Sequence, residues 1–156
     1  MCWTSNKLQP LISDGNVKVR KVCKIDNGKI YSYFFQNFQY ELGKEYQSEI
    51  YISIRKGKQN YYYGYTGFHS YSADNCSIGI YTNFHGVSRF RVRCHTLQNC
   101  VLHTFEDTCN CAVFEGYIPK GKKYYVNTVG EIISESIVLT KKLNKLCVGH
   151  LAVIPC

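Results

Sequence analysis

The chain has 156 residues, 45% of them hydrophobic and 19% charged, which excludes a disordered protein and fits one domain over residues 1–156. The formal net charge of +8 favours anionic partners, with nucleotides, nucleic acid and acidic proteins as candidates. No apolar run is long enough to cross a bilayer, and the N-terminus has no apolar signal-peptide core, so we predict a cytoplasmic protein without membrane contact.

The first part of the chain predicts a lead-in followed by a β-hairpin. We expect residues 1–16 to be irregular, because Pro10 and the polar cluster after it are loop signals. Two extended runs, 17–25 and 29–35, then flank the turn sequence Asp26-Asn27-Gly28. The side chains expected to face inward are Val17, Val19, Ile30 and Phe34.

The stretch 61–71 has the most unusual composition. It holds five Tyr, one Phe and one His within eleven residues, and two Gly interrupt it. Tyr combines an apolar ring with a polar tip, which suits a hydrated binding surface. Two interpretations stay open: a strand end with a tight turn in an aromatic core, or a loop that faces a ligand.

One helix is expected next, over residues 71–83. Ser72 would cap its N-terminus, and Ala73 and Asp74 would lie in its first turn. Elsewhere the pattern is that of short strands separated by turns at roughly 8–12-residue intervals. The predicted fold class is therefore α+β: a β-rich single domain of mostly antiparallel short strands with one or two short helices.

The clearest strand runs from Val87 to Cys94. Because side chains alternate along a strand, Arg89, Arg91 and Arg93 share one face at a spacing of roughly 7 Å. This pattern is typical of a solvated outer face on a half-buried strand. It equally fits a stripe that binds phosphates or carboxylates, since Arg contacts both in bidentate fashion.

The last third of the chain predicts four more strands, at 111–117, 122–127, 131–139 and 146–154. A Pro-Lys-Gly turn separates the first two, and a Gly turn separates the next two. A second basic group surrounds the first of these turns and consists of Lys120, Lys122 and Lys123.

Six residues that could bind a metal lie close together in the sequence: Cys94, His95, Cys100, His103, Cys109 and Cys111. Zinc prefers Cys and His in tetrahedral sets. The spacing matches no usual Cys-x-x-Cys pairing, and the adjacent Cys94 and His95 would face opposite ways on a strand. We assign no metal and no other cofactor, with zinc at these residues as the open alternative. The nine Cys are expected to be mostly free thiols that act as small apolar residues.

No complete catalytic motif is present. A nucleophile needs a base and an orienting group close in space, and pairing one of nine Cys with one of five His can arise by chance. His69 is the best-placed residue for acid–base chemistry, because it lies in a Gly-bounded turn. A hydrogen-bonding role is the more common one for such a His, so we predict a binding protein rather than an enzyme.

Several short blocks occur in a fixed order between residues 1 and 139. They are Met1-Cys2-Trp3, Tyr40-Glu41-Leu42-Gly43-Lys44-x-Tyr46, Gly67-Phe68-His69-Ser70, Tyr117-Ile118-Pro119-Lys120-Gly121-Lys122-Lys123-Tyr124-Tyr125, Gly130-Glu131-Ile132 and Ser134-Glu135-Ser136-Ile137-Val138-Leu139. In this order they resemble a group of small proteins common in bacteriophages of gut bacteria. The resemblance implies a phage counter-defence factor, and some factors of this kind bind and sequester nucleotide immune signals.

A more distant similarity is to ADP-ribosyltransferases, which carry an early Arg or His, a central Ser or Tyr, and a late Glu. His69, Ser70, Tyr71 and Glu135 would occupy the later part of that layout. The chain departs from it in having no early element and in carrying Ser-Glu-Ser where the family has Glu-x-Glu. The resemblance therefore implies a ligand pocket of that shape more than it implies catalysis.

The leading hypothesis is a phage anti-defence protein, in the host cytoplasm, that sequesters a nucleotide-derived immune signal without turnover. The signal would be a cyclic nucleotide or an ADP-ribose derivative, and a homo-oligomer is compatible with this role. One alternative is an ADP-ribosyltransferase-like or nucleotide-processing enzyme, and another is an inhibitor that binds a host protein or nucleic acid. The candidate ligand-binding residues are Tyr63, Tyr65, Phe68, His69, Ser70, Arg89, Arg91, Arg93, Lys120, Lys122 and Lys123.

Overall fold

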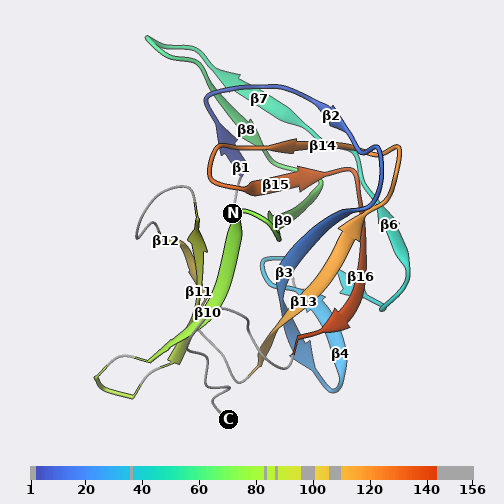
Figure 1. Ribbon diagram of the computed structural model, residues 1–156, viewed down its shortest axis with the longest axis vertical. Coiled ribbons are helices and arrows are strands. Elements are labelled where there is room, and N and C mark those ends of the chain that lie inside the picture. Colours follow the sequence, from blue (N-terminus) through green and yellow to red (C-terminus); the bar gives the residue numbers. More distant parts are fainter. Residues whose placement is uncertain are drawn as a thin grey trace.

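The computed structural model describes residues 3–35, 37–82, 84–86, 88–95, 101–105 and 110–143. Throughout this part of the chain the regular structure is β-strand, and no helix is formed (Figure 1). The predicted β-rich architecture is confirmed, but the α+β class and its one or two short helices are wrong. Within these same residues no helix exists that could span a membrane.

The segment predicted to be a helix is a strand pair instead. Residues 71 and 72 end β9 (Phe68–Ser72), a turn covers residues 73–75, and β10 (Cys76–Thr82) follows. The backbone N–H of Ser72, expected to start a helix, donates to the carbonyl of Gly130 at 2.8 Å. Along β10 the buried Cys76 and Ile78 alternate with polar and glycine positions, so long-range pairing outweighs the local capping signal.

The described residues form three sheets, in which every strand pair is antiparallel. The largest sheet has the order β2 (Leu11–Ile12), β14 (Lys123–Val126), β15 (Glu131–Ser134), β9, β3 (Val17–Asp26), β13 (Cys111–Ile118), β16 (Ser136–Lys142) and β6 (Glu45–Gln47), with β4 (Lys29–Ser32) paired to β3 and to β5 (Gln39–Tyr40). The second sheet has the order β1 (Trp3–Ser5), β8 (Tyr61–Gly64), β7 (Ile52–Arg55), and the third has the order β10, β11 (Ser88–Cys94), β12 (Val101–Phe105).

The predicted hairpin is confirmed, but its second strand ends at Ser32 and not at Phe35. Strands β3 and β4 flank a two-residue turn in which Asn27 and Gly28 have φ values of 50° and 75°. Positive φ at both positions defines the turn type that matches the twist of paired strands. Of the residues expected to face inward, Val19 is fully buried, and Val17 and Ile30 are partly buried against the core. The prediction for Phe34 is wrong, because this side chain is 47% exposed.

The first 16 residues, expected to be irregular, contribute the strands β1 and β2. Trp3 on β1 is buried, and its indole N–H donates to the carbonyl of Glu131 at 3.0 Å. Ser13, just after β2, is held against the loop before β14, where its backbone N–H donates to the carbonyl of Lys122 at 3.0 Å. A large apolar side chain and a few hydrogen bonds are therefore enough to order a segment rich in loop signals.

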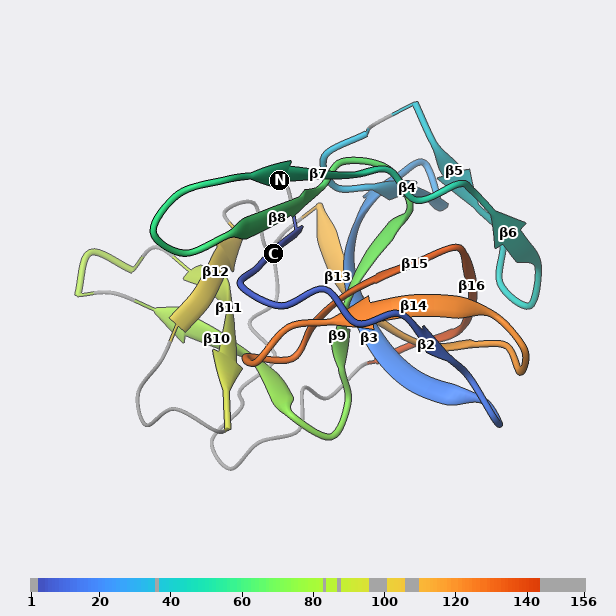
Figure 2. The same ribbon diagram turned by 90° about the horizontal axis from the view of Figure 1, so that it is seen from above.

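Strands β3 and β13 form the centre of the molecule and are buried on both faces. On one face, Val19 and Cys23 pack with Phe114 and Ile118 in a first core. On the opposite face, Val22 packs in a second core beneath the β10–β11–β12 sheet, together with Val113, Phe90 and Val92. Seen from above, that sheet lies to one side of β3 and β13 (Figure 2). Side chains on opposite faces of β3 and β9 therefore lie in two separate environments.

Candidate functional site

An apolar pocket of about 270 Å³ opens on the first-core side of β3. Its walls come from the segment between β4 and β5, from the start of β9 with the turn before it, and from β3 itself. The aromatic lining residues are Phe34, Phe35, Phe38, Tyr40, Tyr65 and Phe68. Its size lies near the lower end of the range typical for small-molecule sites, about 300–1,000 Å³.

The aromatic wall is pre-packed around Phe38. The ring of Phe38 makes edge contacts with Tyr40 and Phe68, at centroid distances of 4.9 and 5.8 Å. The loop that carries it closes on itself, because the N–H of Phe38 donates to the carbonyl of Phe35 at 2.9 Å. Phe35 nevertheless remains 61% exposed. Such exposure of large apolar side chains around a pocket is typical of a site that a ligand covers.

Lys21 supplies the positive charge inside this pocket. Its side chain is only 8% exposed, and its ammonium group donates a hydrogen bond to the backbone carbonyl of His69. Burial lowers the pKa of Lys21 from its ordinary value. Among the described residues no carboxylate lies within ion-pair distance of it, and no Asp or Glu lines the pocket.

Cys23, two residues further along the same face of β3, does not offset this charge. Burial raises the pKa of its thiol to about 12, so the group stays neutral at physiological pH. A buried ammonium group with no anion beside it is costly, because the charged form loses its hydration. When Lys21 is protonated, its positive charge therefore has no carboxylate beside it in the described lining, and an anionic ligand would stabilise it.

The imidazole of His69 belongs to a different environment. Residues alternate along β9, so Phe68 packs in the first core and Tyr71, on the face shared with His69, packs in the second. There the hydroxyl of Tyr71 and Nδ1 of His103 are hydrogen-bonded at 2.6 Å. Burial and the nearby Lys21 lower the pKa of His69 to about 4, and its Nε2 is buried without a hydrogen-bond partner. The imidazole is therefore neutral, and the contribution of His69 to the pocket floor is its backbone carbonyl.

The residues predicted from the aromatic stretch divide between the pocket and its surroundings. Tyr65, Phe68 and His69 line the pocket. Tyr63 is half-buried on β8, where it pairs with Thr4 and lies outside the lining. Ser70 is buried, and its hydroxyl has no hydrogen-bond partner in the described structure.

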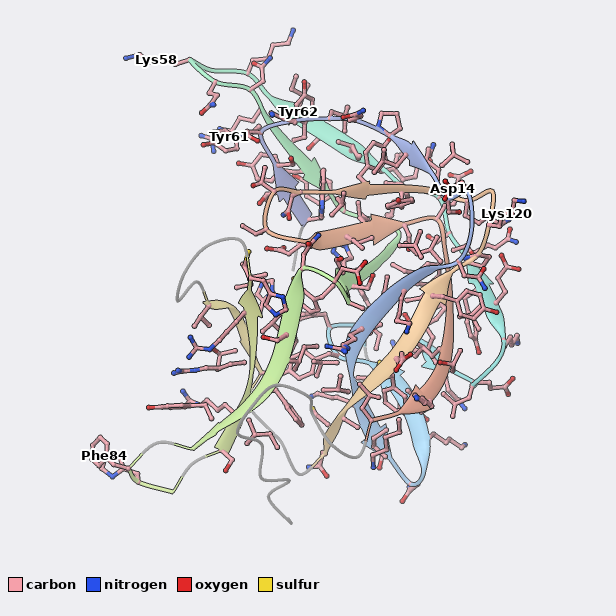
Figure 3. All side chains as sticks on the ribbon, viewed as in Figure 1. Asp14, Lys58, Tyr61, Tyr62, Phe84 and Lys120 are labelled. Atoms are coloured by element: carbon pink, nitrogen blue, oxygen red, sulfur yellow. The ribbon has the colours of Figure 1, made fainter. Side chains whose placement is uncertain are left out.

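The two predicted basic groups lie elsewhere. Arg89, Arg91 and Arg93 are on β11, and none of them lines the pocket. Lys120 projects from the opposite side of the molecule to Phe84 at the β10–β11 connection (Figure 3). The Arg stripe and the Lys group therefore cannot grip one small ligand together.

The remaining Lys residues of that group have local roles. The ammonium group of Lys122 lies 3.7 Å from the carboxylate of Glu45, and the backbone N–H of Lys123 donates to the carboxylate of Glu135 at 2.7 Å. Glu135, the candidate catalytic residue of the enzyme alternative, thus stabilises a turn and does not line the aromatic pocket. It borders a wide polar hollow of about 410 Å³ with Gln47, Ser48, Glu49 and Lys122.

The zinc alternative gains no support from the part of the chain that the structure describes, where no three metal-binding side chains come together. Cys94, the last residue of β11, is buried, and the next residue, His95, is exposed. Cys111 is buried as well. Cys100 and Cys109 lie outside the described residues.

Sequence reasoning missed Lys21 and most of the aromatic wall. A signal for Lys21 was present, because it shares the alternation of Val17 and Val19 and so occupies an inward position of the predicted strand. No comparable signal marked Phe35 or Phe38, whose positions depend on a loop between two strands.

The pocket with its buried ammonium group and the Arg-bearing face of β11 are the features from which function can be inferred. No protein-family model matches the chain, and searches of the curated proteins and of the solved structures give no significant match.

Proposed function

We propose that this protein binds a small planar anion in the aromatic pocket and sequesters it without turnover. The observation that carries the proposal is the ammonium group of Lys21, buried in an aromatic pocket with a backbone carbonyl and no carboxylate beside it. An anionic group placed next to it would replace the missing counter-charge. Such charge-assisted hydrogen bonds are each worth about 1.5–3 kcal/mol.

The lining favours a ligand with an aromatic body. Phe35, Phe38 and Tyr65 offer apolar ring surface near the mouth, and planar groups gain stacking energy on such rings. A nucleotide has both parts, a planar base and a phosphate, and the resemblance to phage proteins makes a nucleotide-derived immune signal the expected member of this class. The volume of about 270 Å³ suits one nucleotide unit, so a cyclic dinucleotide would extend beyond the mouth.

Sequestration is favoured over turnover because the groups that chemistry would need are not assembled at the pocket. The imidazole of His69 faces the second core, and the carboxylate of Glu135 accepts a backbone N–H. Lys21 can hold an anion but has no acid or base of ordinary pKa beside it in the described lining. The proposed role is therefore to bind the ligand and keep it from other proteins without converting it.

Calorimetric titration with charged ligands and one matched uncharged ligand tests the proposal. Adenosine monophosphate, cyclic adenosine monophosphate and ADP-ribose would each be compared with uncharged adenosine. We expect at least one anion to bind about tenfold or more tightly than adenosine, and Lys21→Met to remove that difference. Lys29→Met, at an exposed position of β4, is the control that removes the same charge without touching the pocket.

Equal binding of the charged and uncharged ligands, or full affinity in Lys21→Met, would contradict the proposal. The recovered ligand would also be chromatographed after heat denaturation of the complex. An unaltered ligand supports sequestration, whereas an altered one would assign the protein to the enzymes.

The affinity should also depend on pH in a defined direction. The anion binds best to the protonated Lys21, so affinity is constant while the free protein holds that proton and falls about tenfold per pH unit above the lowered pKa. Loss of affinity on acidification, with a ligand whose own charge does not change, would contradict a role for the ammonium group.

A further inference from the structure

The outer face of the β10–β11–β12 sheet carries a second set of positive charges that the pocket does not use. Phe90 and Val92 on β11 pack in the second core, and Cys94 on the same face is also buried. The alternate positions, Arg91 and Arg93 among them, therefore point away from the protein. We call this surface, formed by Tyr81, Arg89, Arg91, Arg93 and Thr104, the outer face.

Arg91 and Arg93 have no acidic residue opposite them on the neighbouring strands. Arg93 lies opposite Ser77 on β10, and Arg91 lies opposite Gly79 on β10 and Thr104 on β12. The Nε of Arg91 has no hydrogen-bond partner within the described structure. By contrast, four lysines elsewhere, Lys18, Lys44, Lys122 and Lys141, each lie within ion-pair distance of a glutamate. This surface is therefore complementary to an anionic partner.

Aromatic rings accompany these charges. The guanidinium carbon of Arg91 lies 3.6 Å from the ring centroid of Tyr81, which is itself 41% exposed. Beyond the end of β10, Phe84 is 92% exposed, and its ring lies 3.9 Å from that of His85. Figure 3 shows Phe84 at the extremity of this part of the molecule, away from the two large cores. An apolar ring this exposed contributes nothing to the packing of the fold.

We propose that the outer face binds single-stranded nucleic acid. Arg91 and Arg93, roughly 7 Å apart along the strand, contact successive phosphates of an extended strand. Tyr81 and Phe84 stack on unpaired bases, which rings on a sheet face do in known single-strand binders. A duplex keeps its bases stacked on one another, so it cannot use the rings and would gain only from the charges.

This inference is independent of the proposed anion pocket, because none of the outer-face residues lines that pocket. Failure of one proposal leaves the other intact. A variant of the outer face should retain the small-molecule binding, and Lys21→Met should retain the nucleic-acid binding.

Fluorescence anisotropy with a short fluorescein-labelled oligouridylate, over a series of salt concentrations, tests the inference. In the double variant Arg91→Gln/Arg93→Gln, the slope of log affinity against log salt should decrease by about 1.4, since each phosphate contact on a single strand contributes about 0.7. The control Lys29→Gln/Lys120→Gln removes the same charge from exposed positions elsewhere and should leave the slope nearly unchanged.

A second variant separates stacking from charge. Phe84→Ala should weaken oligouridylate binding by about tenfold while the salt slope stays the same, because a stacked base contributes no counterion release. Since Phe84 is almost fully exposed, this variant should fold as the parent does.

Three results would overturn the inference. The first is equal affinity for the oligouridylate and for a duplex of the same length. The second is an equal loss of affinity in the Lys29/Lys120 control, which would show that net charge alone is responsible. The third is displacement of the oligouridylate by polyglutamate at equal charge concentration, which would identify the surface as a site for acidic protein.

Discussion

The aromatic pocket and the outer face both present positive charge, but they present it in opposite ways. In the pocket, one ammonium group is buried and held by a backbone carbonyl. On the outer face, Arg93 is exposed, and Arg91 is stacked on a ring at the surface. A buried charge costs stability until a ligand neutralises it, whereas an exposed charge stays hydrated and costs little.

This difference predicts how each region responds to change. The pocket should be sensitive to backbone geometry, to pH and to the removal of its charge, because each affects groups in a dry environment. The outer face should be sensitive mainly to salt, since screening acts on exposed charges. The predictions below test this contrast from the largest expected effect to the smallest.

The largest effect is expected from two matched glycine substitutions. Gly67 in the pocket wall and Gly86 near the tip beyond β10 both have positive φ, 98° and 79°. A Cβ at Gly67 would lie 3.0 Å from both Ile133 Cγ1 and the carbonyl oxygen of Ser134, whereas one at Gly86 would meet nothing within 4 Å. We expect Gly67→Ala to lower the free energy of unfolding by about 4 kcal/mol, from backbone strain and crowding together.

Gly86→Ala should cost only the backbone component, about 1–2 kcal/mol. Urea denaturation of both variants gives the comparison directly. Equal losses of unfolding free energy would mean that the pocket wall accommodates a Cβ as easily as the exposed tip does. The two regions would then not differ in packing.

The second prediction concerns acid. The unfolded chain binds a proton at His69 near the ordinary pKa of 6.5, but the folded protein binds it only near 4. Stability from this group is therefore fully present above pH 6.5 and is lost as pH falls toward 4. The loss should reach at most about 3 kcal/mol.

The measurement is the free energy of unfolding at pH 7 and at pH 4 for the parent, for His69→Asn and for the control His95→Asn, where the side chain is exposed. Because His69→Asn removes the imidazole, the free energy of unfolding should depend less on pH in this variant, and the control should not show this change. The same steep acid dependence in that variant would assign the effect to other groups, such as His103, whose pKa burial also lowers.

The third prediction is that Lys21→Met stabilises the free protein. Met fills similar space without a charge, and replacing buried charged groups by apolar ones often stabilises proteins by about 1–4 kcal/mol, so we expect about 2 kcal/mol here. Thermal denaturation without ligand would show this as a higher midpoint, together with the loss of anion binding. A residue kept only for packing would show the reverse, a lower midpoint.

How far the sequence predicts this molecule depends on the range of the interactions involved. The β3–β4 hairpin and the stripe on β11 follow from local turn chemistry and from alternation, and both are present. The helix over 71–83 failed because its capping signal was local, whereas the pairing of β10 with β11 and of β9 with β15 joins distant residues. Such pairings decide between strand and helix where propensity is weak.

The pocket was beyond prediction for the same reason. Its walls join residues near 21, 35 and 67, and nothing in the sequence states that these three segments meet. The division of β9 into two faces also decides which neighbours share a site: Phe68 packs in the first core, and the imidazole of His69 faces the second. Adjacent residues of one sequence motif thus lie in two separate environments, because β9 is buried on both faces.

The smallest effect is expected where charge is most concentrated at the surface. Arg91→Gln/Arg93→Gln should lower the free energy of unfolding by about 1 kcal/mol or less in total, because neither side chain forms an ion pair in the described structure and substitution of the exposed Arg93 is close to neutral. The stacking of Arg91 on Tyr81 is the one contact that would be lost, and at an exposed site it is worth about 0.5–1 kcal/mol at most. Urea denaturation at low and high salt checks this. A loss of several kcal/mol would mean that the stripe supports the sheet, and would move its role from binding a partner to holding the fold.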